Sequence, residues 1–199
     1  TDQYGHRTRT LVASPDGKLF TSVGSSCDIC EETQPLRATL LRSDLDGSNL
    51  EIFAHGLRNT VGFAVRNTEE GPQLWGFDMG RNNLGVGIPP ERFVRLEAGR
   101  DYGWPYCVLQ TEARGRADEN LIPTPDPYFE ASVVGNRCQS VERPRYTFPA
   151  HWAPLGILFY EGKDFPSEYQ GDALVAFHGT ATDQTGDVRG GYNVVRLHM

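Results

Sequence analysis

The sequence lacks any long apolar run. None of its 199 residues falls in a stretch that approaches the roughly 18 apolar residues a membrane-spanning helix needs, so we expect no membrane span. Positive charge is also in deficit, with 19 Lys and Arg against 26 Asp and Glu and a formal net charge of −7. Such a chain has no general attraction to phosphate backbones, and we expect no nucleic-acid partner.

Uninterrupted helix-forming stretches are scarce as well. The chain has 22 Gly and 13 Pro, about one residue in six, and both types destabilise helix interiors. Its 38% hydrophobic and 23% charged residues are otherwise ordinary for a globular protein. The composition therefore predicts a turn-rich, all-β fold.

The first residue is Thr rather than Met, and residues 1–9 lack the charged start and apolar run of a signal peptide. We expect the chain to have been processed or to be part of a longer protein.

Cysteine is limited to four residues: a Cys-x-x-Cys motif, Cys27 and Cys30, and a distant pair, Cys107 and Cys138. A zinc site would have to use all four, because there is no second such motif and no His at finger spacing. Covalent haem would need His where Glu31 stands. Of the remaining alternatives, we favour two structural disulfides over zinc, in an exported protein that is periplasmic or secreted.

Three segments resemble one another, each an apolar strand, a polar turn and a second apolar strand ending in Gly. They cover residues 11–24, 61–80 and 156–179 and begin about 50 and about 95 residues apart. A period near 45 residues with several strands per unit is typical of a β-propeller. Outer-strand candidates at 38–42 and 51–54 complete a first four-stranded blade, so the chain supplies about four blades.

An irregular region at 106–147 interrupts this pattern and contains the distal cysteines. We interpret it as an insertion that a Cys107–Cys138 disulfide staples, because a cross-link restricts the unfolded ensemble of a segment with little core of its own.

Six motifs occur in a fixed order across nearly the whole chain. They are Gly5-His6-Arg-Thr-Arg-Thr-Leu11, Ser14-Pro-Asp-Gly-Lys-Leu19, Val23-Gly-Ser-Ser-Cys27-Asp-Ile-Cys30-Glu-Glu32, Gly56-Leu-Arg58-Asn59, Asp101-Tyr102-Gly-Trp104-Pro-Tyr-Cys107 and Ala153-Pro-Leu-Gly156. In this order they resemble the glucose/sorbosone dehydrogenase family, soluble six-bladed propellers that use pyrroloquinoline quinone (PQQ). The segment 23–32, which contains Cys27 and Cys30, resembles the sorbosone dehydrogenase-like branch.

The resemblance implies an oxidoreductase that oxidises a sugar or sugar aldehyde by hydride transfer to PQQ and passes electrons to an external quinone or cytochrome. It also implies that residues 1–199 form a partial propeller without its N-terminal blades, because family members carry substantial sequence before the His that matches His6.

Two residues carry the expected chemistry. Oxidising a hydroxyl requires a base for its proton, and the resemblance assigns this role to His6, whose ordinary pKa allows a neutral ring. Arg58 would contact the quinone, because a guanidinium suits a group that gains negative charge on reduction. The alternatives are a surface His6 and an Arg58 that forms a salt bridge between blades.

The resemblance also implies calcium, bound by the backbone carbonyls at Gly80 and Arg81, since calcium prefers oxygen ligands. Acidic or polar residues that relatives carry nearby are replaced in this chain. The departures are Val86, Gly87, Arg92 and Val94, and they weaken the expectation of calcium and of activity.

Five further residues match cofactor contacts in the family. Asn59 follows Arg58, and His151 precedes the Trp152-Ala-Pro motif. Tyr102 and Trp104 offer flat walls for a planar quinone, with core packing as the alternative. Arg189 matches a basic residue that reaches the cofactor's carboxylates.

Two other functions stay open. A non-catalytic propeller could bind a glycan or a protein, and a lactonase-type hydrolase could hold calcium through Asp78, Asn82 and Asn83.

Overall fold

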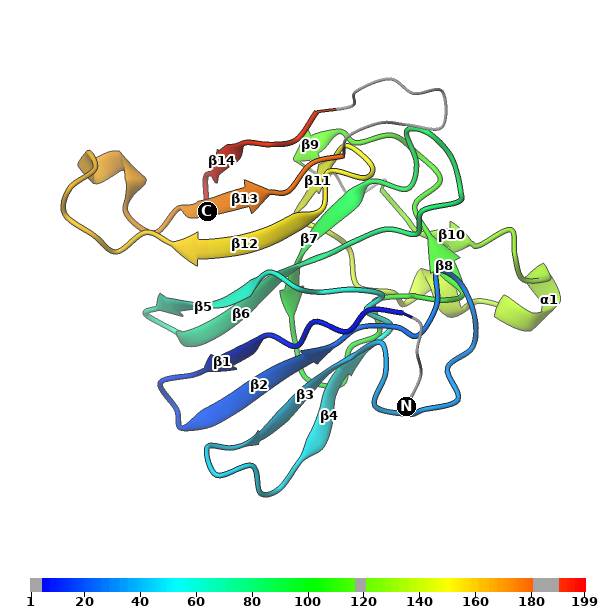
Figure 1. Cartoon of the computed structure of the whole chain (residues 1–199), viewed down its shortest axis with the longest axis horizontal. Helices are drawn as coiled ribbons and strands as arrows, with labels where there is room; N and C mark the ends of the chain where they lie inside the picture. The colour runs from blue at the N-terminus through cyan, green and yellow to red at the C-terminus, as the bar shows by residue number, and fades with distance from the viewer. Residues whose placement is uncertain (1–4, 117–120, 181–189) are drawn as a thin grey trace.

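The computed structural model describes residues 5–116, 121–180 and 190–199 (Figure 1). Within these residues the regular structure is almost entirely strand, and α1 (Ala131–Val134) is a single turn. The expectation of an all-β fold is confirmed. No helix in the described part of the chain is long and apolar enough to cross a membrane.

The first sheet is a four-stranded antiparallel meander of β1 (Leu11–Ala13), β2 (Lys18–Val23), β3 (Thr39–Asp44) and β4 (Glu51–His55), in that order. The turn between β3 and β4 contains Gly47 at φ 85°, a conformation that glycine adopts without strain. The predicted first hairpin and both outer strands are confirmed.

The second sheet has five strands in the order β5-β6-β7-β11-β9. It begins with the hairpin of β5 (Phe63–Thr68) and β6 (Gly71–Asp78), which pairs onward to β7 (Glu91–Leu96). β11 (Tyr146–Phe148) pairs with β7, and β9 (Gly115–Arg116) pairs with β11.

The third sheet consists of β12 (Pro154–Phe159), β13 (Ala173–Phe177) and β14 (Val194–Leu197). A short separate pair joins β8 (Cys107–Val108) to β10 (Thr124–Pro125). Two 3-10 turns, η1 (Arg137–Gln139) and η2 (Ser167–Tyr169), complete the described elements.

The three repeated segments are the hairpins that open the three sheets: β1–β2, β5–β6 and β12–β13. Figure 1 shows β5 and β6 lying between the first sheet and the third, and β5 contacts both β1 and β12. The first strands of successive sheets are therefore neighbours.

The number of repeated units differs from the sequence expectation. A period near 45 residues predicts two units in the 95-residue interval between the second and third hairpins, but β9 and β11 pair back onto the second sheet. The described residues thus hold three such sheets rather than about four, because the insertion extends a sheet instead of building another.

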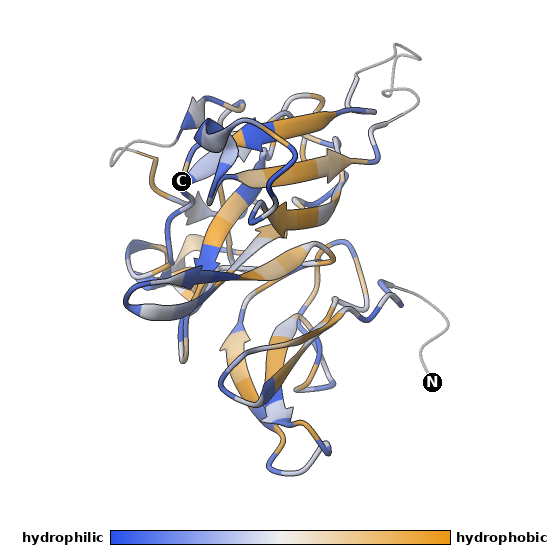
Figure 2. Cartoon of the chain, turned by 90° about the vertical axis from the view of Figure 1, so that its left-hand side faces the viewer, coloured by the Kyte–Doolittle hydropathy of each residue, from blue (hydrophilic) through white to orange (hydrophobic). Residues whose placement is uncertain are grey.

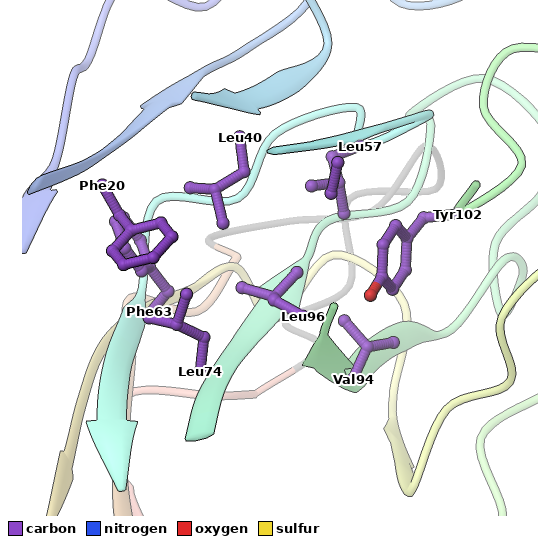
Figure 3. Packing of buried hydrophobic residues seen from close by; sticks show 9 residues of the cluster. Phe20, Leu40, Leu57, Phe63, Leu74, Val94, Leu96 and Tyr102 are labelled. Carbon is purple, nitrogen blue, oxygen red and sulfur yellow. The ribbon is translucent and has the colours of Figure 1, made fainter. Parts of the chain in front are cut away.

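The second sheet is buried on both faces because consecutive residues of β6 point to opposite sides. Leu74 joins a core against the first sheet, together with Phe20 and Leu40 (Figure 3). Trp75 and Phe77 join a core against the third sheet. Figure 2 shows hydrophobic residues in orange along parts of several strands.

Both predicted disulfides are present, Cys27–Cys30 and Cys107–Cys138, and no cysteine is free. The zinc alternative is therefore wrong, since all four sulfurs are used. The Cys107–Cys138 bridge packs with Val134 and Val141 in a small hydrophobic cluster within the region 106–147.

Candidate functional site

A pocket of about 440 Å³ opens where the chain leaves the ends of several strands. This volume lies in the usual range for small-molecule sites. The pocket brings together five residues that the sequence singled out from segments far apart in the chain: His6, Arg58, Asn59, Gly80 and His151.

Backbone hydrogen bonds bind these segments together. His6 precedes β1, and its N–H donates to the Ser25 carbonyl at 2.9 Å. The N–H of Ser25 donates in turn to the carbonyl of Arg58 at 2.8 Å. The segment that follows β2 is thereby hydrogen-bonded to the segment before β1 and to the segment before β5. This places His6 and Arg58 in the same wall of the pocket.

His6 is a neutral imidazole under ordinary conditions. Burial lowers its pKa to about 4, and the positive charge of Arg58 acts in the same direction, although the Ser25 backbone and the carboxylates of Asp78 and Asp28 oppose them. Its Nδ1 lies 3.0 Å from the Ser25 hydroxyl. A neutral imidazole in a pocket wall can accept a proton.

Arg58 is 3% exposed and its charge is balanced inside the protein. Its Nη2 donates to the Asp28 carboxylate at 2.6 Å and its Nε to the Asp28 carbonyl at 3.2 Å. The salt bridge between segments that the sequence left open is therefore present, and the same guanidinium also lines the pocket.

Asp28 is a functional candidate that the sequence analysis missed. Its carboxylate also accepts the backbone N–H of Asn82 at 2.7 Å and that of Asn83 at 3.2 Å. Burial alone would raise its pKa, but these hydrogen bonds and Arg58 hold the pKa below the ordinary value. Asp28 thus holds both the Arg58 guanidinium and the loop at Asn82 and Asn83 in place. In the sequence, the only feature that could have pointed to Asp28 is its position inside the Cys-x-x-Cys motif.

Glu91 is the second missed candidate. It is 3% exposed, lines the pocket, and accepts the N–H of Gly80 at 2.9 Å and of Ala153 at 3.2 Å. Burial raises its pKa to about 7, against the effect of those hydrogen bonds and of Arg58. The pocket therefore contains a carboxylate that could bind a metal ion. It comes from β7, the strand in which Arg92 and Val94 replace acidic or polar residues of the family.

Two aromatic candidates lie outside this pocket. Tyr102 is fully buried in the core shared with the first sheet, and its hydroxyl donates to the Arg95 carbonyl at 2.6 Å. Trp104 donates from Nε1 to the Asp28 carbonyl at 3.2 Å and so supports the wall that holds Arg58. Neither ring lines the pocket, because both are used for packing behind it.

The three remaining predicted cofactor or metal contacts differ in where they lie relative to the pocket. The Arg81 side chain turns away into an ion pair with buried Asp126 at 2.6 Å. His151 lines the pocket and donates from Nε2 to the Gly85 carbonyl at 3.0 Å. Arg189 lies outside the described residues.

The residues that depart from the family pattern have structural roles. Arg92 forms a buried pair with Asp78 at 2.6 Å, and Val94 is fully buried in the core. Val86 lines the pocket with 42% of its surface exposed, and Gly87 lies against Glu112.

Fold and site together define an all-β protein with a pocket at the strand ends in which a neutral histidine, a paired arginine and a buried glutamate face one small-molecule cavity. The chain belongs to the TrAA12-like family, which it matches over residues 1–199. The sorbosone dehydrogenase-like branch receives no separate support from this match.

Among curated proteins, the chain is 32% identical over 171 residues to an uncharacterised protein of Borreliella burgdorferi, covering 85% of this chain and 40% of that protein. Among solved structures it is similar to a calcium structure of carbohydrate-active enzyme family AA12 from Trichoderma reesei, with a TM-score of 0.78 and 21% identity over 98% of this chain and 53% of the other. It is also similar to the holo form of the PQQ domain of pyranose dehydrogenase from Coprinopsis cinerea, with a TM-score of 0.72, 21% identity and the same coverage. At this identity the likenesses show a shared fold, and the chain spans about half the length of those chains.

Proposed function

We propose that this chain carries the cofactor pocket of a PQQ-dependent sugar oxidoreductase. The observation that carries the proposal is a neutral His6 in the same pocket wall as the fixed cation Arg58. The family membership and the fold shared with a PQQ domain support it. The proposed substrate is a sugar or a sugar aldehyde. The aldehyde is supported by the sequence alone, through the segment 23–32 that resembles the sorbosone dehydrogenase-like branch.

The residues present fit such a cofactor. The pocket has room for a small planar molecule, and its polar lining offers a guanidinium and the amide groups of Asn59, Asn82 and Asn83 as donors to carboxylates and carbonyls. Arg189 would add a cation if it follows the family pattern. When bound, PQQ supplies the electrophilic acceptor for a hydride.

The chain's own residues divide the remaining work. His6 takes the proton from the substrate hydroxyl, and Arg58 offsets the negative charge that develops beside it. Asp28 keeps Arg58 in place. An external quinone or cytochrome removes the electrons.

Calcium belongs to the same proposal. The Gly80 and Arg81 carbonyls and the Glu91 carboxylate are the oxygen donors that would hold it. Glu91 retains part of the acidity that is lost at Val86, Gly87 and Arg92.

We further propose that the three sheets are successive blades of a six-bladed propeller and that the protein is exported. The adjoining first strands β1, β5 and β12 support the first point, since inner strands surround a central channel in a propeller. The two disulfides support the second.

The test is titration of the protein with PQQ, with and without calcium, followed by dye reduction with a panel of aldoses and sugar aldehydes. We expect a stable coloured complex, and in His6→Gln a turnover at least about 100-fold lower with PQQ affinity nearly unchanged. The matched control is His198→Gln, because His198 is a histidine whose side chain is 77% exposed and outside the pocket.

The same experiment separates the alternatives. Failure to bind PQQ under both conditions would overturn the proposal and favour a glycan- or protein-binding module. A lactonase would instead hydrolyse lactones with calcium alone, although Asp78 is poorly placed for that role because it lies outside the pocket lining and is paired with buried Arg92 at 2.6 Å.

A further inference from the structure

The side chain of Ser25 lies between two groups that together fix the direction of its hydrogen bonds. Ser25 lies two residues beyond the end of β2 and is fully buried. Its Oγ lies 2.6 Å from the carbonyl oxygen of Cys27 and 3.0 Å from Nδ1 of His6.

A serine hydroxyl has one proton to donate. The Cys27 carbonyl can only accept, and two oxygens 2.6 Å apart need a hydrogen between them. The Ser25 proton is therefore committed to Cys27. Toward His6 the Ser25 Oγ offers only lone pairs, so the hydrogen bond at 3.0 Å must be donated by Nδ1–H.

We propose that Ser25 is a positioning residue that fixes neutral His6 as the Nδ1–H tautomer. The unprotonated nitrogen is then Nε2, so the ring enters the pocket with a single defined proton-accepting atom. The chain of donation runs from His6 to Ser25 to Cys27.

Several contacts hold the backbone around Ser25 and its hydrogen-bond acceptor in place. The Ser25 carbonyl accepts the His6 N–H at 2.9 Å, and the Ser25 N–H donates to the backbone carbonyl of Arg58. The Arg37 guanidinium lies 3.3 Å from the His6 carbonyl and 3.4 Å from that of Ser25. The acceptor Cys27 is itself held by the disulfide to Cys30.

The catalytic consequence rests on the proposed function, whereas the tautomer does not. If His6 is the base, a ring that also populated Nε2–H would be unable to take a proton for part of the time. Loss of the Ser25 hydrogen bond should then lower kcat by about 2-fold to 10-fold, the equivalent of one ordinary hydrogen bond, with KM for the sugar little changed.

The test is long-range ¹H–¹⁵N correlation of the histidine rings in uniformly ¹⁵N-labelled protein at pH 7, without any ligand. The His6 signals are assigned by their loss in His6→Gln. We expect the Nδ1 resonance in the range of protonated ring nitrogens and the Nε2 resonance in the range of unprotonated ones. In Ser25→Ala the pattern should move toward Nε2–H, and Ser25→Thr, which keeps the hydroxyl, should retain the wild-type pattern.

Ser22→Ala is the matched control, because Ser22 is another buried serine of the same region whose hydroxyl accepts the Thr10 N–H rather than a bond from His6. A wild-type spectrum of the Nε2–H form would overturn the proposal by itself, even if Ser25→Ala failed to fold. An unchanged Nδ1–H pattern in folded Ser25→Ala would also overturn it. The expected tautomer combined with full dye reduction by His6→Gln would instead refute His6 as the base and leave the positioning role of Ser25 intact.

Discussion

His6 keeps a pKa of about 4 because its ring is largely removed from water and faces the charge of Arg58. In the unfolded chain the same ring titrates near 6.5. The folded protein therefore binds fewer protons at His6 than the unfolded chain does at mildly acidic pH. By linkage, this residue lowers the free energy of unfolding as the pH falls from 6.5 toward 4.

We expect the difference in unfolding free energy between wild type and His6→Gln to change between pH 7 and pH 4.5. Relative to the variant, the wild type should lose about 1–2 kcal/mol, a value discounted for the partial exposure of the ring. Urea unfolding at the two pH values measures this change. An equal difference at both would show that His6 titrates normally in the folded protein.

Gly24 allows His6 its place in the wall. A Cβ built on Gly24 would lie 2.5 Å from the His6 Cβ and 2.9 Å from the Asn59 Oδ1. Gly24→Ala should therefore displace His6 and destabilise the protein by about 1–3 kcal/mol. It should also reduce PQQ-dependent turnover in the dye assay.

The control for this change is Gly156→Ala, since a Cβ there would meet only the Ala176 Cβ at an ordinary 3.5 Å. Thermal unfolding of the two variants should separate them. Equal stability and equal turnover would mean that the loop before β1 adjusts freely around an added methyl group.

At the residue scale, sequence reasoning brought His6, Arg58 and Asn59 into one pocket because each is part of a recognisable motif. It did not find Asp28 or Glu91. Their roles come from partners that only the fold supplies, since Arg58 lies 30 residues beyond Asp28 and the two N–H donors of Glu91 flank it from different segments. Single carboxylates in a sequence carry no sign of such partners.

At the scale of elements, the disulfide-closed turn at 27–30 joins four segments through Asp28. Asp28→Ala would leave the buried Arg58 without its counter-charge, and breaking a buried pair in this way costs about 3–5 kcal/mol. Urea unfolding should show that loss, and PQQ affinity should fall because the Asn82–Asn83 loop is released. Glu51→Ala, which removes an exposed partner of Arg42, should change stability by less than about 1 kcal/mol.

The two disulfides should differ in what their removal does. Cys107–Cys138 closes a 31-residue separation and Cys27–Cys30 a separation of 3. On loop-closure entropy, replacing the distal pair by Ser should cost about 3–4 kcal/mol and the proximal pair about 1–2 kcal/mol.

The effect on PQQ affinity should be the reverse: removing Cys27–Cys30 should weaken PQQ binding more than removing Cys107–Cys138. The reason is that the turn at 27–30, the proximal turn, supports Ser25, Asp28 and the pocket wall. Calorimetry or urea unfolding together with PQQ titration would measure both effects. A proximal variant with wild-type PQQ affinity would contradict the role given to the turn.

Hairpins were the elements most readily predicted, since alternating apolar residues and turn glycines are local signals. The opening hairpins of all three sheets were found in this way. The pairing of β11 with β7 and of β9 with β11 was not, because these two strands are two or three residues long and join partners more than 20 residues away in sequence.

At the scale of the whole molecule, the all-β class followed from composition, and the side-by-side arrangement of similar sheets followed from the repeat. The count of sheets did not, because a period cannot distinguish an added sheet from an insertion of similar length. The two cores make the three sheets one unit, with the second sheet shared between them.

The shared position of the second sheet has a consequence for hydrogen exchange. β6 and β7 are paired on both edges and covered on both faces, so their amides become accessible only when both cores open. We expect the slowest amide exchange of the chain in β6 and β7, with rates that report global unfolding. Exchange should be faster in β4 and β14, which lie at sheet edges. Mass-spectrometric exchange would test this order, and equal protection of β4 and β7 would mean that the first sheet does not open independently of the second.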